Sequence, residues 1–451
     1  MKSILKNKLE NLDQSGVRNE YKIATYERYL ISSLRYHFSI HNIHQTQLDQ
    51  LDMIANKFLK KWAGIPSRGS TNLSIFHPQL MGIKSPAQLY MEGHAGNFLL
   101  CRVKSDQNVQ LALDSQLSRE SQWTRKFSTV NQCKQIFEQV SENLCVPTRE
   151  NTHNFESSLR NQLPILKKAV KETVAEQFKA KFNNQANNLQ VQGDFISLLS
   201  SEDLDVTWKS YIYGVPRGVM SFAMRSSTNI LATPDNLKRW KKARSDNCLM
   251  CYQQDKPPSK CTLHHLLNNC TAFLEDRYVW RHDSFITYIV ETLKLEKPEH
   301  LDIFADIDGH RTNGLTIPSS VIITQQRPDI VCIDRSTTPP TVWLFELSVS
   351  FEQNIERAHA RKQARYAFLE VDIRESGYSC NNIPFEVGSR GHITQSNRSN
   401  LATMHKLAKP KTSLKNFLTM VSRISLLCSY SIYLSRNDRG WSDPPPLRPY
   451  K

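Results

Sequence analysis

The spacing of apolar side chains predicts a long helix near the start of the chain. Across residues 48–62 apolar positions recur at steps of three and four, while Lys57 and Lys60 fall on the opposite side. This pattern is typical of a helix that buries one face and keeps a solvated basic face on the other. Pro66 and Gly69 follow, and we expect them to end the helix.

The next part of the chain, residues 116–207, is polar and rich in Gln, Asn, Ser and Lys. It contains stretches dominated by good helix formers, such as residues 163–182. We interpret this part as a helical connector. Residues 213–235 follow and are interpreted as a turn-rich stretch.

In the second half of the chain the hydrophobic pattern changes to a period of two. Two β-rich runs, residues 327–334 and 342–351, are joined by a turn segment with two prolines, and together they predict a hairpin. In the second run five large apolar side chains alternate strictly with a set that includes Glu346. One face of this strand is therefore expected to be core and Glu346 to project from the other. A third strand from about Asn382 would extend the sheet.

The helix expected after the hairpin has its own start signal, with Ser350 as N-cap and Gln353 at the capping-box position. A lysine is the unusual member of its inward stripe. Its side chain could reach water at the helix edge, or it could point at the same pocket as Asp329 and Glu346. The stripe is Ile355, Ala358, Lys362, Tyr366 and Leu369.

The two acids of the hairpin are candidate metal ligands. Asp329 lies near the start of the first run and Glu346 within the second, so an antiparallel pairing could place them close together. Two close carboxylates repel each other unless a cation neutralises them, and Mg²⁺ prefers oxygen ligands. The pair therefore predicts a catalytic Mg²⁺ site.

A cluster of cysteine and histidine residues predicts a structural zinc site. Its spacing, with two residues between the first two cysteines and a His and a Cys on a later turn, suits a tetrahedral zinc ion. Four protein ligands would leave no position open for a catalytic water. Cys261 and His264 are alternative ligands, because a small shift of the loop would exchange either for a neighbour. The expected ligands are Cys248, Cys251, His265 and Cys270.

The net charge of the chain, +15 over 451 residues, favours a polyanionic partner such as nucleic acid, or an acidic membrane surface. We find no uninterrupted apolar run of the length that a membrane helix needs and no signal peptide, so an intracellular, soluble protein without a membrane partner is expected. A dense basic run next to the cysteine cluster would suit phosphate contacts, although a solvated helix face explains it equally well. The run contains Lys238, Arg239, Lys241, Lys242 and Arg244.

Several segments, taken together, carry a resemblance to a known family. They are the Cys-Cys-His-Cys cluster, WRHDSFITYIVETL (280–293), RPDIVCID, LFELSVSFEQNIERAHARKQARY and PFEVGSRG. Their combination and order resemble the restriction-like endonuclease region at the C-terminus of site-specific non-LTR retrotransposon polyproteins, over residues 208–405. The segment before residue 90 looks like the helical thumb of the same polyproteins. The polymerase aspartate motif is not found, so the chain resembles the part that follows the palm.

The resemblance implies roles for particular residues. Asp329 matches the aspartate of the Pro-Asp motif and Glu346 the second acid, while Lys362 and Tyr366 match the displaced lysine and tyrosine of the following helix. Arg281 is a lesser candidate for contact with DNA.

One departure bears on these roles. In many related nucleases the lysine lies two residues after the second acid, where this chain has Ser348. The lysine's role therefore depends on Lys362 having taken it over from the helix. Arg365 stands before the tyrosine, where the family often has lysine.

The expected fold class is α+β, with a restriction-like nuclease domain of the PD-(D/E)xK class whose mixed β-sheet is flanked by helices. The expected parts are a thumb-like helical region (1–115), a helical linker (116–207), a basic segment with the zinc knuckle (208–275), the nuclease domain (276–410), and a C-terminal helix with a flexible Pro-rich tail (411–451).

The expected function is Mg²⁺-dependent nicking of target DNA for retrotransposon insertion, in the nucleus, without polymerase activity in this chain. Expected partners are target DNA, element RNA and a polymerase-bearing copy of the element protein. The main rival is a non-catalytic DNA- or RNA-binding relic of such an element. A resolvase or repair nuclease outside retroelements is disfavoured by the thumb-like segment.

Overall fold

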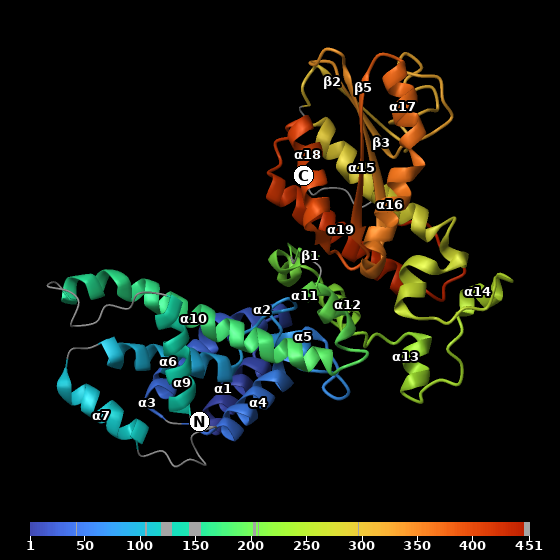
Figure 1. Cartoon of the computed structure of the whole chain (residues 1–451). Coiled ribbons are helices and arrows are strands. Elements are labelled where there is room, and N and C mark those ends of the chain that lie inside the picture. The colour runs from blue at the N-terminus through green and yellow to red at the C-terminus, as the bar shows by residue number, and fades with distance from the viewer. Residues whose placement is uncertain are drawn as a thin grey trace. The chain divides into compact units, whose positions relative to one another are not determined.

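The computed structural model describes residues 1–41, 43–103, 106–118, 129–143, 155–201, 204–205, 207–295 and 297–445. The chain forms two compact units, Met1–Ser197 and Leu198–Lys451. The described elements of the first unit are helices, and the second unit holds a mixed four-stranded sheet with helices around it (Figure 1). This confirms the α+β class. The finer division into five parts stays a prediction.

The first unit is a helical assembly in which α6 packs against α3, α4, α9 and α10. Its elements are α1 (Lys2–Gln14), α2 (Asn19–Thr25), η1 (Tyr26–Leu30), η2 (Ser32–Leu34), α3 (Arg35–Ile40), α4 (Gln45–Ala63), α5 (Leu73–Phe76), α6 (Pro86–Val103), α7 (Gln107–Ser118), α9 (Thr129–Asn143), α10 (Phe155–Asn187) and α11 (Asp194–Ser201), the last of which runs across the boundary of the two units.

Helix α4 confirms the helix predicted over residues 48–62, and it ends at Ala63, three residues before Pro66. Gly64 follows the last helical residue with a φ of 71°, a left-handed conformation that glycine adopts without strain. The expected position of Lys60 on a solvated face is wrong. Its side chain is buried, and its Nζ donates to the carbonyl of Ser70 at 2.8 Å. Burial lowers the pKa of Lys60 to about 8.

Helix α10 confirms the helix expected at residues 163–182 and extends beyond it on both sides. It packs against α6 and α9, so this segment contributes to the core of the first unit. Residues 119–128 and 144–154 of the expected linker lie outside the described part of the chain.

The second unit begins with short helices and ends with two long ones. Its elements are β1 (Leu204–Asp205), η3 (Thr207–Ser210), η4 (Ile212–Gly214), α12 (Arg217–Ser227), α13 (Pro234–Arg239), α14 (Leu249–Gln253), η5 (His265–Asn269), η6 (Thr271–Phe273), α15 (Arg277–Lys294), β2 (Leu301–Ala305), β3 (Ile330–Asp334), β4 (Thr341–Ser350), η7 (Glu352–Asn354), α16 (Ile355–Arg365), α17 (Ala367–Glu375), β5 (Ser379–Gly388), β6 (Ile393–Thr394), α18 (Gln395–Ala408) and α19 (Leu414–Leu434).

The turn-rich interpretation of residues 213–235 is wrong for much of that stretch, because α12 occupies Arg217–Ser227. The apolar residues of α12 are spaced for a helix and bury Val219, Met220 and Phe222 against the unit's core. Tertiary packing outweighs the weak helix propensity of the glycine and serines in this segment.

The strands pair in the order β2-β3-β4-β5. β3 and β4 form the predicted antiparallel hairpin, with Ile330 opposite Phe345 and Asp334 opposite Thr341. β5 is the predicted third strand, and it pairs parallel with β4 after the chain has crossed over through α16 and α17. β2 pairs antiparallel with β3 and was not predicted from the sequence.

Strand β4 is covered on both faces, so the expectation of a single core face is wrong. Val342 and Leu344, on the same face as Glu346, belong to a buried cluster with Tyr366 and Leu369 of the crossover helices. In Figure 1 α16 and α17 lie on one side of the sheet, and α15, α18 and α19 lie on the other. A polar side chain on either face of β4 is therefore removed from water.

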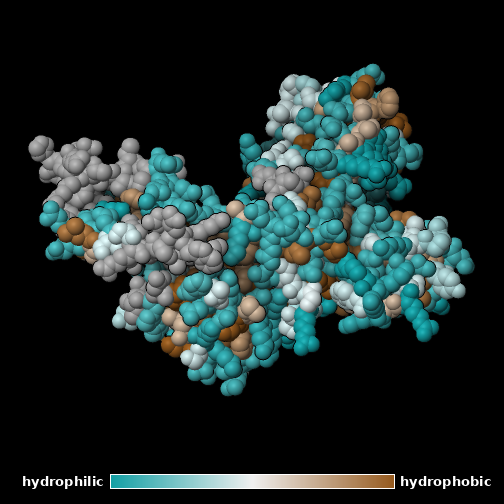
Figure 2. Space-filling view, turned by 60° about the horizontal axis from the view of Figure 1, so that its bottom comes forward, coloured by the Kyte–Doolittle hydropathy of each residue, from teal (hydrophilic) through white to brown (hydrophobic). Residues whose placement is uncertain are grey.

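Helix α19 corrects the expectation that no apolar stretch is long enough to cross a membrane. Leu414–Leu434 passes that test by length and composition, with a mean hydropathy of 1.4. However, 61% of the tested window is buried inside the protein, where α19 packs against α15 and the sheet. The face of the molecule in Figure 2 is largely hydrophilic, with hydrophobic residues in small separate patches. We interpret α19 as a core helix.

The beginning of the Pro-rich tail is held against α15. The indole of Trp280 donates to the carbonyl of Pro444 at 2.7 Å and packs edge-on against Trp441, with ring centroids 5.4 Å apart. Residues 441–444 are therefore packed against α15 and do not form a flexible tail. Residues 446–451 lie outside the described part of the chain.

Candidate active site and metal centre

The hairpin and α16 bring the two predicted acids and the predicted lysine together. Asp329 directly precedes β3, and Glu346 lies in β4 next to the residue that pairs with Ile330. The Nζ of Lys362 lies 2.6 Å from Glu346 Oε2 and 3.3 Å from Asp329 Oδ2. One ammonium group thus bridges two carboxylates, one directly before β3 and one within β4.

Main-chain hydrogen bonds fix both carboxylates. The amide of Asp329 donates to Glu346 Oε1 at 2.9 Å, and the amide of Leu347 donates to Asp329 Oδ2 at 2.7 Å. Each acid therefore accepts from the strand that carries the other. The Glu346 side chain has no exposed surface, while that of Asp329 keeps 12%. Asp329 is thus the acid through which this pair meets solvent.

Lys362 arrives from the helix stripe, and its side chain follows the second of the two alternatives. Ile355, Ala358, Tyr366 and Leu369 of that stripe are buried, as predicted. Lys362 points at the acids with 14% of its side chain exposed, so it does not extend along the helix edge into water.

The expected capping box at the start of this helix is wrong. Ser350 is the last residue of β4, Gln353 lies in the turn η7, and α16 begins only at Ile355. Asn354 is its N-cap and makes no side-chain cap hydrogen bond. The strand continues past the predicted N-cap because its pairing with β5 extends to Ser350.

His282 joins this cluster, and the sequence prediction did not include it. Its Nε2 lies 3.2 Å from Asp329 Oδ2, and its Nδ1 lies 3.2 Å from Asp283 Oδ1. It projects from α15, which packs on the sheet beside β2 and β4. The available signal was its place in the segment 280–293, where only Arg281 was singled out.

The charges in the cluster shift one another's pKa. Burial opposes ionisation of Asp329, but the positive charges of His282 and Lys362 lower its pKa below the ordinary value. Burial and the charge of Asp329 raise the pKa of Glu346, against the opposing effect of Lys362. Burial disfavours the charged form of His282, yet Asp329 and Asp283 raise its pKa to about 9. Burial disfavours the charged form of Lys362 as well, but Asp329 and Glu346 raise its pKa.

Tyr366 lies behind the acids. Its ring is buried in the core cluster, and its hydroxyl donates to the carbonyl of Arg327 at 3.1 Å, two residues before Asp329. Burial, with the charge of Glu346, raises its pKa above the ordinary value. These contacts support a role in positioning the segment that carries Asp329.

Arg281 is buried and its guanidinium group is bound to main-chain carbonyls, which disfavours the DNA contact expected for it. Its side chain is buried and lies over the ring of Tyr278, with 5.0 Å between the guanidinium carbon and the ring centroid. Nη1 donates to the carbonyl of Leu267 at 2.8 Å, and Nη2 to that of Val349 at 3.4 Å. Arg281 therefore joins α15 to β4 and to residues 248–270, the stretch from the first to the last predicted zinc ligand, which we call the cysteine segment.

The acid pair offers carboxylate oxygens, which are the type of ligand that a hard divalent cation takes. Glu346 is a buried carboxylate whose pKa is raised, first by its burial and then by the charge of Asp329. Asp329, directly before β3, and Glu346 in β4 both supply oxygen atoms, the ligands that Mg²⁺ prefers. These two residues would hold the ion.

The four predicted zinc ligands converge. One ligand atom from each of Cys248, Cys251, His265 and Cys270 lies within 4.8 Å of all the others, and all four residues are buried. The Sγ of Cys251 lies 3.5 Å from His265 Nε2 and 3.6 Å from Cys270 Sγ. This buried Cys3His set can hold a metal ion such as zinc, and four protein ligands suit a structural site.

The two alternative zinc ligands differ in position. His264 points away from the cluster: its Nε2 lies 3.0 Å from Asn354 Nδ2, and its ring lies 4.7 Å from that of Phe351. Cys261 is buried near Cys248, whose pKa it lowers by hydrogen bonding. It is outside the set of four mutually close ligand atoms.

The metal centre is tied to the strand that carries Glu346. Between the ligands His265 and Cys270, the Nδ2 of Asn268 donates to the carbonyl of Val349 in β4 at 2.7 Å. The same carbonyl accepts from Arg281. The position of the end of β4 therefore depends on the fold of the cysteine segment.

The basic run spans the end of α13 and the turn after it, and its five side chains are exposed. Lys238 pairs with Asp246 at 2.7 Å, and Arg239 donates to Asn236 Oδ1 at 2.6 Å. For the other three, Lys241, Lys242 and Arg244, no ion pair is recorded among the described residues. The run is thus more than a helix face, and part of its charge is available to an external anion.

A scan against models of protein families finds no match to this chain, and a search of curated proteins finds none either. A function for the chain is therefore argued from the geometry of its site.

Proposed function

We propose that the chain is a Mg²⁺-dependent DNA endonuclease that nicks target DNA for retroelement insertion. The observation that supports this proposal is the cluster of Asp329, Glu346 and Lys362, in which two carboxylates of the hairpin region share one helix-borne ammonium group. Buried acids of this kind, held by main-chain amides beside a lysine, are costly to fold and favour a chemical role over a structural one. The net charge of +15 supports a polyanionic substrate.

The proposed reaction is hydrolysis of a phosphodiester. Water attacks phosphorus, the bond to the 3′-oxygen breaks, and the products carry a 3′-hydroxyl and a 5′-phosphate. A bound Mg²⁺ would supply an acidified water and neutralise charge on the phosphate. Lys362 keeps its positive charge at neutral pH, because the two acids raise its pKa. It can stabilise negative charge that develops on the phosphate oxygens. The 3′-hydroxyl would serve as a primer for a polymerase-bearing partner.

The test is nicking of supercoiled plasmid by the purified chain with and without Mg²⁺. Asp329→Asn and Glu346→Gln keep the size of each side chain and remove its charge, so we expect both variants to lose nicking while DNA affinity is retained. Asp302→Asn is the matched control, since Asp302 lies on the same sheet and pairs with Arg335 at the surface. This control should nick at the wild-type rate.

The rival function is non-catalytic binding of nucleic acid. It is supported by the exposed basic run, which does not depend on the acid pair. Tight DNA binding by a wild-type chain that nicks no plasmid at any Mg²⁺ concentration would favour this rival and contradict the nuclease.

A further inference from the structure

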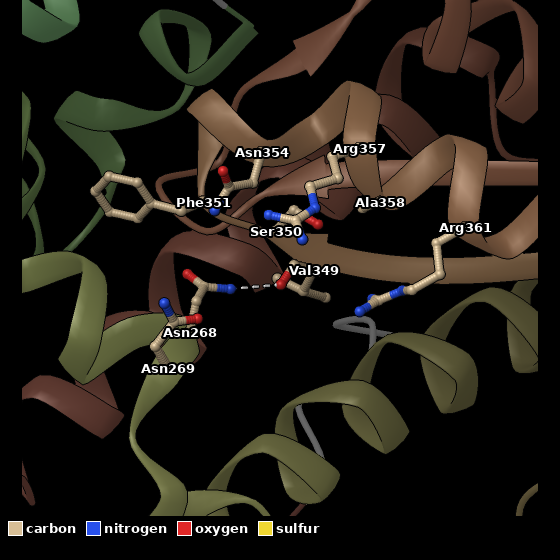
Figure 3. A pocket seen from close by; sticks show the side chains of 9 residues that line it. All are labelled: Asn268, Asn269, Val349, Ser350, Phe351, Asn354, Arg357, Ala358 and Arg361. Carbon is tan, nitrogen blue, oxygen red and sulfur yellow. Dashed lines mark hydrogen bonds between the residues drawn. The ribbon is translucent and has the colours of Figure 1, made fainter.

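An open groove of about 560 Å³ lies beside the acid cluster, between the cysteine segment and α16. Figure 3 shows Arg357 and Arg361 extending from α16 over the end of β4, with Asn268 and Asn269 opposite them. Asn354 lines the groove as well. Two arginines and three carboxamides face this space, and none of its lining residues is an acid.

The two arginines form a like-charge pair, and no acid of the described residues makes an ion pair with either of them. They lie four residues apart on α16, which places both on one face of the helix, where like charges repel. Both side chains are exposed, and among the described residues neither has a recorded ion pair. By contrast, Arg335 and Arg374 of the same unit each pair with an acid, Asp302 and Glu370.

The groove is lined by α16 and β4, the two elements that also carry Lys362 and Glu346. Arg361 precedes Lys362 on α16, and Val349 lies three residues after Glu346 on β4. Three residues span about 10 Å along a strand, which corresponds to about three phosphates on one strand of B-DNA. An occupant of the groove would therefore be continuous with a phosphodiester held at Asp329.

The opposite wall adds neutral hydrogen-bonding groups. Asn268 and Asn269 lie between the metal ligands His265 and Cys270, and Asn268 is fixed by its bond to Val349. One arginine guanidinium group can donate two parallel hydrogen bonds to the oxygens of a phosphate. Asparagine side-chain amides donate to phosphate and sugar oxygens. A small anion would need far less space than this groove offers.

From this groove we infer a binding site for the backbone of the DNA strand that is cut, with Arg357 and Arg361 contacting phosphates a few nucleotides from the scissile bond. This inference rests on the proposed function, since it names how the substrate of that site is positioned. Sequence readout is not implied, because guanidinium groups on phosphates position a strand without identifying its bases.

The test compares two double variants that remove equal charge. Arg357→Ala/Arg361→Ala should weaken binding of a short DNA duplex at least tenfold and flatten the slope of log K against log salt by up to about 1.8, or 0.9 per phosphate contact. Arg335→Ala/Arg374→Ala should leave both nearly unchanged. Binding is measured by fluorescence anisotropy without Mg²⁺, and thermal unfolding checks that both variants are folded.

An unchanged slope in the groove variant, or an equal loss in both variants, would overturn the inference. So would a groove variant that loses affinity for an RNA oligonucleotide while keeping its affinity for DNA. Plasmid nicking is scored separately. If the wild-type chain never nicks but the salt slope falls only in the groove variant, the groove binds DNA and the proposed nuclease activity is contradicted. If the wild-type chain nicks but the groove variant has an unaltered slope, the nuclease activity is supported and the groove inference is contradicted.

Discussion

At the scale of single residues, the main feature of the protein is the sharing of charge between four side chains from three parts of the fold. His282, Asp329, Glu346 and Lys362 lie within hydrogen-bonding or ion-pairing distance of at least one other member. Removing one member leaves its partners buried without compensation, which costs more than the pair contributed. Substitutions here will therefore affect stability as well as activity, and thermal unfolding of each variant is needed to separate the two.

Lys362→Ala should lower Mg²⁺-dependent nicking by about two to three orders of magnitude, because it removes a preorganised positive charge beside the phosphate. Plasmid nicking under single-turnover conditions measures this loss. Lys406→Ala, an exposed lysine on α18, is the control and should nick normally. A Lys362→Ala variant as fast as wild type, next to an inactive Asp329→Asn variant, would leave the acid pair in place and remove the lysine from the mechanism.

Asp52 of α4 predicts a pH dependence of stability in the first unit. Its carboxylate accepts from the amide of Ala87 at 2.8 Å, and burial raises its pKa from 3.8 to about 6. A raised carboxyl pKa favours the folded state below about pH 4, and this contribution is lost as the pH rises through 6. We therefore expect Asp52→Asn to raise the free energy of unfolding at pH 7 by at most about 3 kcal/mol, and so to unfold at a higher temperature than wild type.

The difference in unfolding temperature between Asp52→Asn and wild type should shrink as the pH falls from 7 to 4. Thermal unfolding monitored by circular dichroism measures this difference. Asp106→Asn, an exposed acid of the same unit, is the matched control and should show no such trend. A difference that is independent of pH would show that the carboxyl group of Asp52 is not the titrating group.

At the scale of elements, the cysteine segment and β4 depend on each other. The segment supplies four metal ligands, one wall of the groove and a hydrogen bond to Val349. Metal binding organises such short segments, because few other contacts hold them. Loss of a bound metal should therefore affect the position of Glu346 through the end of β4.

Cys251→Ser and Cys270→Ser should each lose the single zinc ion that we expect per chain, and should lower the unfolding temperature of the second unit by roughly 10 °C. Metal analysis of the purified protein and calorimetry measure the two effects. Cys101→Ser, in the first unit, is the control and should keep both. If Cys261→Ser lost the metal and Cys270→Ser kept it, the ligand set would have to be redrawn.

At the scale of the whole molecule, the chain consists of two units that each have their own buried core. Units of this kind commonly unfold in separate steps. We expect two calorimetric transitions, of which chelation of the metal lowers only one, and Asp52→Asn shifts only the other. A single transition that both changes move equally would show that the two cores unfold together.

Local patterns determined a large part of this fold. The alternation in residues 342–351 predicted β4, the apolar spacing in residues 48–62 predicted α4, and the cysteine spacing predicted the metal ligands. Each of these patterns depends on residues that are close in sequence, where backbone geometry alone sets which side chains share a face. For the same reason the stripe that contains Lys362 could be identified before its target was known.

Only the tertiary structure decided which polar groups lose water and what they meet. Lys60 and Arg281 have charged side chains of the kind usually found at the surface, but both are buried and donate to main-chain carbonyls. His282 meets Asp329 because α15 packs across the sheet, and Arg357 faces Asn268 because the cysteine segment folds onto the end of β4. These contacts join segments far apart in the chain. No local period encodes them, because burial depends on how complete elements pack and not on the residues within one element.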